Sequence, residues 1–408
     1  MIKCGLLGKK LSHTFSPEIH GMLGDYEYTL FEKGEDEVAD FIKNGDFTGI
    51  NVTIPFNKTV MPYMDELSDV AKKVGSVNTI VRRPDGTLYG DNTDVYGFME
   101  LVRKSGIEVG NKKVLVLGSG GASVAVTAAL EMLNAKPVII SRSGENNYDN
   151  LDLHKDAGVI VNTTPLGMYP DNGKAALSLK LFPALCGVID IIYNPSRTAL
   201  VLEADDLSIP AIGGLYMLVA QAVKSSEQFQ KKDIPVSKID EIYNCLSVRM
   251  QNLVLVGMPG SGKTTIAKLL GERLDREVID TDIKITEREG RSPSAIITED
   301  GESVFRDIET DVIKDLGKLS GKIIATGGGA VLRKDNYNLL KQNGIIIWIR
   351  RDAALLPTDD RPLSKGRDLN ELFRERKPYY EQFADMTVEN TVPKDAVKDI
   401  LSKLEAFF

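Results

Sequence analysis

The feature that most constrains the fold is a glycine-rich segment, Gly257-Met-Pro-Gly-Ser-Gly-Lys-Thr264, which directly follows the apolar run 252–256. A short apolar run that stops at a glycine cluster is typical of a buried strand entering a tight turn. Glycines in such a turn let backbone N–H groups point inward at a bound phosphate chain. The turn glycines are Gly257, Gly260 and Gly262. The segment therefore predicts an α/β domain built around a phosphate-binding loop.

Two polar side chains and a helix complete this loop. Lys263 can reach the outer phosphates of a nucleoside triphosphate, and the Thr264 hydroxyl can bind Mg²⁺. We expect a helix from Thr265 to Leu274, whose positive end faces the same anion. The loop explains the second part of the chain and leaves everything before residue 252 to be explained.

Composition excludes several classes of protein. A chain of 408 residues, 42% hydrophobic and 26% charged, is long enough for about two or three globular domains. A net charge of −8 argues against a nucleic-acid-binding surface. Three scattered cysteines and three histidines without ligand spacing argue against a disulfide framework or a transition-metal site. No apolar run has the length of a membrane span or a signal peptide, so we expect a cytoplasmic enzyme that binds no membrane; oligomerisation stays open.

A second strand–glycine–helix pattern lies upstream. The apolar run 113–117 precedes Gly118-Ser-Gly-Gly-Ala-Ser123, and a helical pattern follows at 124–133. This order is typical of dinucleotide-binding folds, where the turn approaches a pyrophosphate. The candidate cofactor-binding residues of the turn are Gly118, Gly120, Gly121 and Ala122.

The next strand indicates which dinucleotide is bound. The apolar run 137–140 ends in Ser141-Arg142-Ser143, with no acidic residue where an NAD enzyme holds its ribose. An arginine beside hydroxyls suits the additional 2′-phosphate of NADP. Ser141 and Arg142 are therefore predicted to bind NADP; the alternative is that Arg142 is a solvated residue at a strand end.

Polar clusters in apolar surroundings fill the first hundred residues. Each is weak by itself, because Asn, Ser and Asp are ordinary turn residues. Together, ahead of a dinucleotide motif, they suit a cleft for a small polyhydroxy acid. The clusters span 12–17, 51–58, 76–79 and 90–94.

In this order the first 240 or so residues resemble shikimate dehydrogenase, a two-domain enzyme that uses NADP(H) to reduce 3-dehydroshikimate to shikimate. The resemblance includes these clusters, the glycine turn, 162–168, 190–195 and 214–221. It implies that Thr14, where the family usually has serine, and Ser16 bind the substrate carboxylate. It implies further substrate-binding residues at Thr53, Asn78, Asp94, Tyr193 and Gln221, and places Gly214 near the nicotinamide.

One position departs from that family. Its catalytic lysine follows a proline–aromatic pair, where this chain has Asn57, and a lysine comes one residue later as Lys58. An asparagine can hydrogen-bond a substrate oxygen but cannot usefully supply a proton at neutral pH. Two hypotheses follow. Either Lys58 reaches back beside Asp94 so that the two act as catalytic residues, or the dehydrogenase is slowed by the roughly 10²- to 10⁴-fold that acid–base assistance contributes.

Charged residues beyond the phosphate loop suggest phosphoryl transfer. Residues 277–282 have the pattern of a strand that ends in Asp280 and Asp282, which as i and i+2 would share one face. One carboxylate can hold Mg²⁺ while the other accepts a proton from the phosphoryl acceptor. Arg306 and Glu309 lie one turn apart on a predicted helix. Further candidate segments are the glycine turn 323–330, a lid at 358–366 and the basic run 374–380.

These spacings resemble shikimate kinase over essentially all of 250–408. The resemblance implies that Lys263 and Thr264 hold ATP–Mg²⁺, with Asp280 as an indirect metal ligand and Asp282 as the catalytic base. Arg361 would close over the phosphates. The shikimate site would comprise Asp282, Arg306, Gly328 and Arg376. The alternative for Arg306 and Arg376 is an ordinary surface salt bridge.

The predicted architecture is α/β: a two-domain dehydrogenase, with an α/β substrate domain and a Rossmann-like NADP domain, fused to a P-loop α/β kinase domain. We expect the dehydrogenase at 1–245, with substrate domain 1–100 and about 214–245 and NADP domain 101–213, and the kinase at 246–408. The leading function is a bifunctional enzyme that makes and then phosphorylates shikimate. Alternatives are a kinase carrying a weakened dehydrogenase-like domain, a kinase for another small molecule, and a GTPase, which would need an Asn-Lys-x-Asp element that the sequence lacks.

Overall fold

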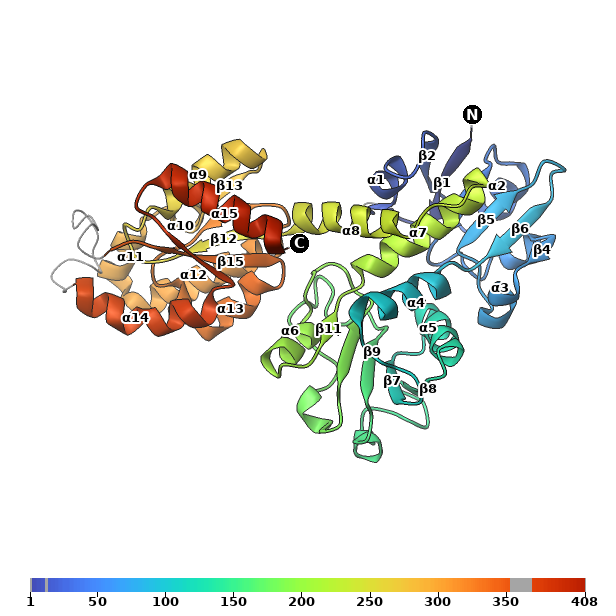
Figure 1. The fold of residues 1–408 in the computed structure, drawn as a ribbon, viewed down its shortest axis with the longest axis horizontal. Coiled ribbons are helices and arrows are strands. Elements are labelled where there is room, and N and C mark those ends of the chain that lie inside the picture. The colour runs from blue at the N-terminus through green and yellow to red at the C-terminus, as the bar shows by residue number, and fades with distance from the viewer. Residues whose placement is uncertain (1, 12–13, 353–368, 408) are drawn as a thin grey trace. The chain divides into compact units, whose positions relative to one another are not determined.

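The computed structural model describes residues 2–11, 14–352 and 369–407 (Figure 1). Its contacts divide the chain into two units. The first comprises Met1–Tyr193 and Leu200–Cys245, and the second comprises Asn194–Ala199 and Leu246–Phe408. Residues 194–199, which the sequence places in the NADP domain, thus cluster with the second unit. Among the described helices, none combines the length and apolarity needed to cross a bilayer.

The first unit begins with a mixed six-stranded sheet in the order β2-β1-β3-β5-β6-β4 (Figure 1). Strand β1 is parallel to β2 and β3, whereas β5 is antiparallel to β3 and β6. The strands are β1 (Lys3–Gly8), β2 (Glu27–Glu32), β3 (Gly49–Val52), β4 (Glu66–Leu67), β5 (Thr79–Arg82) and β6 (Leu88–Asp91). The helices around them are α1 (Ser16–Gly21), α2 (Val38–Asn44), η1 (Met61–Tyr63), α3 (Asp69–Val74) and α4 (Asp94–Ser105). Alternate apolar residues such as Leu7, Ile50 and Ile80 pack with α2 to form its core.

A second, entirely parallel sheet follows in the order β11-β10-β9-β7-β8. Its strands are β7 (Lys113–Leu117), β8 (Lys136–Ile140), β9 (Val159–Asn162), β10 (Gly187–Asp190) and β11 (Ala211–Ile212). Its helices are α5 (Gly121–Met132), η2 (Leu151–His154), η3 (Leu179–Leu181) and α6 (Ala199–Asp206). In the usual dinucleotide-binding order a third strand pairs with the second. Here β8 is the edge strand, and the connection 141–158 to β9 holds only the short helix η2.

Helix α7 (Leu215–Gln230) returns the chain to the first sheet. It packs along α4 and contacts β3 and β5, and Phe229 near its end joins a small core with Cys4 and Val81. Helix α8 (Ser237–Met250) follows, and Tyr216 on α7 stacks edge-on against Tyr243 on α8. Helix α7 therefore belongs with the first sheet, as expected for a return of the chain to the substrate domain from about residue 214.

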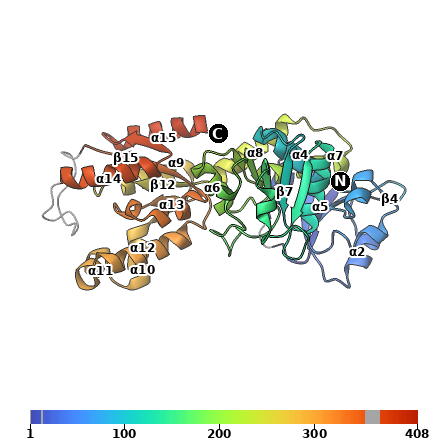
Figure 2. The same ribbon diagram turned by 90° about the horizontal axis from the view of Figure 1, so that it is seen from below.

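The second unit is a parallel five-stranded sheet in the order β13-β14-β12-β15-β16. Figure 2 shows α9 and α15 on one side of this sheet and α10, α12 and α13 on the other, in agreement with two separate apolar cores. Its strands are β12 (Asn252–Val256), β13 (Val278–Asp280), β14 (Ile323–Ala325), β15 (Gly344–Arg350) and β16 (Met386–Glu389). Its helices are α9 (Lys263–Leu274), α10 (Thr281–Glu289), α11 (Pro293–Asp300), α12 (Glu302–Leu316), η4 (Ala330–Leu332), α13 (Lys334–Lys341), α14 (Leu369–Phe383) and α15 (Pro393–Phe407).

Candidate active sites

The first unit contains a cavity of about 870 Å³ at the carboxyl ends of β1, β3 and β10. Every residue of this unit that the sequence predicts to bind substrate lines it, together with the first turn of α5 and Gly214. These lining residues are Thr14, Ser16, Thr53, Lys58, Asn78, Asp94, Gly121, Ala122, Tyr193, Gly214 and Gln221. The structure thus gathers residues from across the first unit into one cavity.

Hydrogen bonds fix two groups of these side chains. The Thr14 hydroxyl donates to Ser16 Oγ at 3.0 Å and accepts from the Ser16 N–H at 3.1 Å, so two hydroxyls lie together at the start of α1. The Asn78 amide oxygen accepts the Thr93 N–H at 2.8 Å. Because that bond occupies the oxygen, the Asn78 NH₂ group is the part left to face Asp94 and a substrate hydroxyl.

Asp94 is the first residue of α4 and lies deep in this site. Burial raises the pKa of its carboxyl to about 6, while a hydrogen bond with Asn78 acts in the opposite direction. Gln221 approaches the same region from α7, with its NH₂ group donating to Leu218 O at 2.9 Å. A half-buried carboxyl beside two amides can bind hydroxyl groups and can also exchange a proton with them.

Asn57 and Lys58 both line the cavity, so the one-residue offset does not send them to opposite faces. They lie in a turn after β3 rather than in an extended segment. The Asn57 NH₂ group donates to Val52 O at 2.8 Å and to Val77 O at 3.3 Å. Lys58 is exposed, and the described residues give it no ion pair or hydrogen bond with Asp94.

Sequence reasoning missed Lys10 and the apolar wall of this cavity. Lys10 lies just beyond the carboxyl end of β1, the edge where ligands bind in open α/β sheets, and that position was the available signal. Met217 and Leu218 line the cavity from α7 beside Gln221. In the sequence, the positions of Met217 and Leu218 indicated only that this face of the helix is buried, not that it lines a cavity.

The dinucleotide turn is open and suits a pyrophosphate. No side chain caps the N-terminus of α5, so its first N–H groups are available to an anion. Side-chain positions at Gly120 and Gly121 would meet no atom within 4 Å. Ser141 and the exposed Arg142 follow the carboxyl end of β8, and Gly118 lies between β7 and this turn. These residues fit NADP(H).

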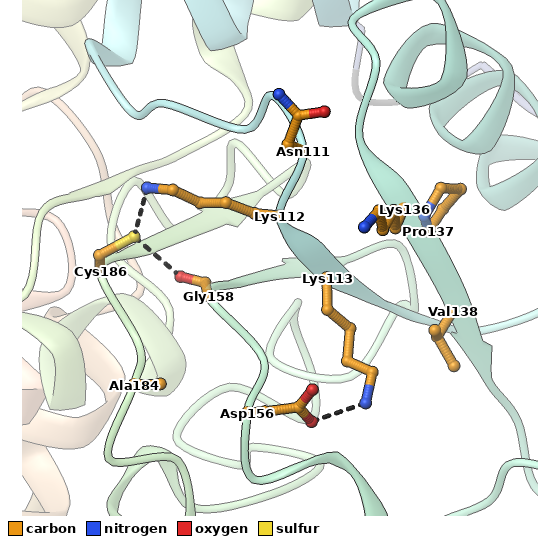
Figure 3. A pocket seen from close by; sticks show the side chains of 10 residues that line it. All are labelled: Asn111, Lys112, Lys113, Lys136, Pro137, Val138, Asp156, Gly158, Ala184 and Cys186. Atoms are coloured by element: carbon orange, nitrogen blue, oxygen red, sulfur yellow. Dashed lines mark hydrogen bonds and ion pairs between the residues drawn. The ribbon is translucent and has the colours of Figure 1, made fainter.

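A second cavity in this unit lies at the amino ends of β7 and β8 (Figure 3). Lys112 Nζ donates to Cys186 Sγ at 3.0 Å, and Lys113 Nζ pairs with an Asp156 oxygen at 2.6 Å (Figure 3). Ligands in open α/β sheets bind at the carboxyl ends of strands. This lysine-lined cavity is therefore separate from the cofactor edge.

The phosphate loop of the second unit has the expected form. Gly262 has a φ of +94°, and a side chain there would overlap the Asn390 amide, so only glycine fits. The buried Lys263 ammonium donates to Gly257 O at 2.9 Å and Met258 O at 3.0 Å. Helix α9 begins at Lys263, and no side chain caps its N-terminus, so the N–H groups of its first turn, which includes Thr264 and Thr265, are not used by a capping side chain. Exposed helical N–H groups and a lysine inside the loop suit a nucleotide phosphate.

The carboxylates after β13 correct one expectation. Asp280 and Asp282 do not share a strand face, because β13 ends at Asp280 and α10 begins at Thr281. Asp280 is the N-cap, and its Oδ1 accepts the Asp282 N–H at 3.0 Å, which turns the chain into the helix. Its Oδ2 accepts a hydrogen bond from the Thr264 hydroxyl at 2.9 Å. A hydroxyl and a carboxylate beside the phosphate loop suit Mg²⁺, which is usually bound through few protein ligands.

Arg306 lies inside the second unit rather than on its surface. Its side chain is 7% exposed and pairs with Glu309 at 2.6 Å and Glu302 at 3.0 Å. Burial raises the pKa of the Glu309 carboxyl, and Arg306 opposes that rise. A side chain at Gly329 would overlap the guanidinium, so the glycine turn packs directly on it. The surface salt-bridge alternative for Arg306 is wrong.

Arg376 approaches the same glycine turn from α14. Its Nη1 donates to Gly328 O at 3.1 Å, and the Tyr380 hydroxyl donates to the same oxygen at 2.6 Å. Only 4% of Arg376 is exposed, so the surface alternative fails here also. Sequence reasoning missed Tyr380, although its i+4 spacing from Arg376 was a signal. Arg361 of the predicted lid lies outside the described residues.

One buried atom shows that this site suits a polar ligand. Within the described part of the chain, Glu309 Oε1 is buried without a hydrogen-bond partner. A side chain at Gly327 would approach this oxygen at 2.6 Å and Asp282 Oδ1 at 3.2 Å. Two guanidinium groups and two carboxylates therefore gather at a close-packed glycine turn, a donor and acceptor set that suits a hydroxylated carboxylic acid.

Known proteins resemble both parts of the chain. Residues 259–405 match the family model described as shikimate kinase, and residues 6–80 match the one described as shikimate dehydrogenase substrate binding domain. A shikimate dehydrogenase (NADP(+)) of Clostridium perfringens is 35% identical over 267 residues, covering 60% of this chain and 98% of the relative.

Solved structures give the same picture for the first unit. A chorismate mutase/shikimate 5-dehydrogenase fusion protein from Clostridium acetobutylicum has 35% identity and a TM-score of 0.57, covering 60% of this chain and 97% of that one. Shikimate 5-dehydrogenase from Thermus thermophilus, solved with NADP(H) and shikimate, has 26% identity and a TM-score of 0.55, covering 60% of this chain and 99% of that one.

Proposed function

Since the chain belongs to the shikimate dehydrogenase family over 60% of its length and carries a shikimate kinase domain beyond it, we propose that it catalyses two successive reactions. The first unit reduces 3-dehydroshikimate to shikimate with NADPH, and the second phosphorylates shikimate to shikimate 3-phosphate with ATP. The observation that carries this proposal is that the two parts of one chain share a metabolite, the product of one reaction being the substrate of the other.

In the first unit the cavity provides separate contacts for each part of the substrate. Thr14 and Ser16 bind its carboxylate, and Asn78 and Gln221 bind ring hydroxyls. Thr53 and Tyr193 line the same cavity and complete its wall. Asp94 and Lys58 are the candidate catalytic groups, and both line that cavity.

The cofactor NADPH supplies the hydride for this reduction. The α5 N-terminus, with Gly118, Gly120, Gly121 and Ala122 around it, holds the pyrophosphate by its free N–H groups. We propose that Ser141 and Arg142 take the 2′-phosphate and that Gly214, which lines the cavity, lies beside the nicotinamide.

In the second unit ATP supplies the phosphoryl group and Mg²⁺ is held by Thr264 and, indirectly, by Asp280. Gly260, Gly262, Lys263 and Thr265 surround the phosphates. Asp282 accepts the proton of the shikimate hydroxyl, while Arg306 and Arg376 bind the carboxylate beside Gly328. Arg361 is proposed to close over the phosphates. Closure there would exclude water, which could otherwise take the phosphoryl group in hydrolysis.

The first test measures NADPH oxidation by the intact chain with 3-dehydroshikimate and no ATP, followed by phosphorylation of shikimate with ATP. We expect both activities. A Lys263→Ala chain serves as a control that should lose phosphorylation and keep NADPH oxidation. A preparation that phosphorylates shikimate but binds NADPH and 3-dehydroshikimate without turnover would contradict the first reaction and favour the alternative of a kinase with a disabled dehydrogenase, which Asn57 motivates.

We propose that both reactions take place in the cytoplasm. The three cysteines are free thiols, which suits the reducing cytoplasm. The ligands we propose are small molecules, with neither nucleic acid nor membrane as a partner. Sedimentation of the intact chain would give the oligomeric state, on which we make no proposal.

A further inference from the structure

The dehydrogenase cavity has a single acidic side chain among its described lining residues, and it is Asp94. This inference rests on the proposed reduction of a carbonyl group in that cavity. We propose that protonated Asp94 delivers the proton to the substrate's carbonyl oxygen, and that Asn57 is a positioning residue with no part in the proton transfer.

The side-chain NH₂ group and the backbone oxygen of Asn57 are both engaged by the protein's own backbone. Its NH₂ group donates to Val52 O at 2.8 Å and to Val77 O at 3.3 Å, and its own backbone oxygen accepts the Val77 N–H at 2.9 Å. These bonds tie the turn after β3 to the residue immediately before Asn78. Both amide hydrogens are used, so Asn57 shapes the cavity by holding Asn78 in place.

The two lysines that line the cavity are poorly placed to supply the proton. Lys10 and Lys58 are both exposed, so their ammonium groups are hydrated. Asp94, by contrast, is held at the start of a helix and is bonded to Asn78, which is 5% exposed. A proton donor has to be within hydrogen-bond reach of the oxygen that it protonates, and the half-buried carboxyl, held in place by a hydrogen bond, meets that condition better than an exposed lysine.

The surroundings of Asp94 favour its neutral form. Burial raises the pKa of the carboxyl to about 6; the hydrogen bond with Asn78 and the positive end of α4 both act the other way. Charged side chains on α4 and on the helices packed against it are paired with one another. The pairs are Arg103–Glu100 within α4, Lys104 with Asp240 of α8, Lys224 with Glu227 within α7, and Lys73 with Glu131 of α5.

The proton transfer balances without a further reactant. The carbonyl carbon receives the hydride that NADPH supplies, and the π electrons of the C=O bond move to oxygen. The O–H bond of Asp94 breaks as a new O–H bond forms on the substrate. The resulting carboxylate regains its proton from water. In the reverse direction the Asp94 carboxylate accepts the proton of the shikimate hydroxyl.

The test is the pH dependence of carbonyl reduction by the intact chain. With Asp94 as donor, the rate falls about tenfold per pH unit above a pH near 6, because the donor is lost as it ionises. Asp94→Asn should lower the rate by about 10²- to 10⁴-fold and remove this limb. Asp36→Asn, a change at an exposed aspartate, is the matched control.

Lys58→Ala distinguishes the two candidate donors. If Asp94 is the donor, the variant retains the limb near pH 6, whatever its maximal rate. If Lys58 is the donor, the unaltered chain shows no fall in rate between about pH 6 and 8, and Lys58→Ala lowers the rate across that whole range. The second result would overturn the proposal.

A readout independent of turnover is the titration of the carboxyl itself. In protein labelled with ¹³C at the aspartate carboxyls, one resonance should titrate near pH 6 and be missing from Asp94→Asn. Its absence from the unaltered chain would overturn the proposal. A chain that shows this resonance but oxidises no NADPH would instead contradict the proposed function, so the two failures are distinguishable.

Discussion

The two units differ in how many of their predicted binding and catalytic side chains are in place. In the second unit the predicted cations are buried against partners: Arg306 pairs with Glu309, and Arg376 bonds Gly328 O. In the first unit every predicted substrate ligand lines one cavity, but the position after Pro55-Phe56 carries an asparagine bonded to the backbone. Binding a substrate is distributed over many residues, whereas moving its proton depends on one or two.

This difference has a thermodynamic side. Breaking a buried pair such as Arg306–Glu309 leaves an uncompensated charge, which typically costs about 3–5 kcal/mol. The first unit instead holds a half-buried carboxyl, Asp94, and desolvation raises its pKa, so its environment disfavours the charge. In the second unit the buried charges of Arg306 and Glu309 are paired with each other. In the first unit the ionised form of Asp94, present above about pH 6, lowers the stability of the folded state.

The largest effect is expected from Asp282→Asn in the second unit. Loss of the general base should lower phosphorylation of shikimate by about 10²- to 10⁴-fold. The measurement is ADP release at saturating ATP and shikimate, with NADPH oxidation by the same preparation as the control for folding. A loss smaller than tenfold would show that Asp282 is no base, and would leave the first unit as the only one of the two with a proposed acid–base group.

The second prediction concerns stability and Asp94. Its folded pKa of about 6 exceeds the ordinary 3.8, so the unfolded chain loses this proton at lower pH and stability falls as pH rises from about 4 to 6. The full difference corresponds to about 3 kcal/mol. Asp94→Asn should therefore stabilise the first unit by about that amount at pH 8 and by about half at pH 5.

Calorimetry of the intact chain measures this difference, and the transition of the second unit serves as the internal reference. Asp36→Asn should leave both transitions unchanged at both pH values. Equal stability of Asp94→Asn and the unaltered chain at pH 8 would mean that the carboxylate is well compensated when ionised, which would remove the contrast between the units.

Sequence patterns located most of the elements because local rules govern them. The run 113–117 is the strand β7 and 252–256 is β12, since apolar runs ending at glycine have few other uses. Each turn leads into an uncapped helix, as the phosphate-binding pattern requires. The residues that line the dehydrogenase cavity were predicted instead from the resemblance to shikimate dehydrogenase, since Asn78 precedes β5 and Gln221 lies within α7, where no strand end marks them.

The features that the sequence did not predict depend on individual hydrogen bonds and on the order of the strands. Asp280 was expected to continue a strand through to Asp282, but its side chain caps α10, so Asp282 lies on a helix instead. The sequence did not show that β8 is an edge strand. The length of the connection 141–158 implies the lack of a further strand only once the order of strands in the sheet is known. The role of Asn57 depends on two backbone oxygens that no pattern identifies.

The third prediction concerns recognition in the second unit. Arg306→Ala should raise the KM for shikimate by about 10- to 100-fold, since a charge-assisted hydrogen bond contributes about 1.5–3 kcal/mol, and change the KM for ATP about twofold at most. The double variant Arg306→Ala/Glu309→Gln avoids leaving a buried carboxylate unpaired and serves as the folding control. Equal changes in the two KM values would refute the assignment of Arg306 to shikimate.

Binding in this unit has its own optical reporter. The chain has a single tryptophan, Trp348, whose ring stacks on Tyr380 with centroids 5.5 Å apart. Tyr380 donates to Gly328 O in the proposed shikimate site, so shikimate binding should change the fluorescence of Trp348. In Arg306→Ala the change should require correspondingly more shikimate, which checks the KM result without turnover.

The smallest effect is expected from Asn57→Lys, which tests directly what separates the two units. An ammonium at this position stays protonated well above pH 8, so carbonyl reduction at pH 8 should rise about tenfold, where Asp94 is largely ionised. The nearby cation should also lower the pKa of Asp94 by about 1–3 units. Asn57→Ala, which removes the bonds to Val52 and Val77 without adding a charge, should lower the rate instead. If the lysine variant is no faster than the alanine variant, the first unit is limited by the shape of its cavity and not by its proton donor.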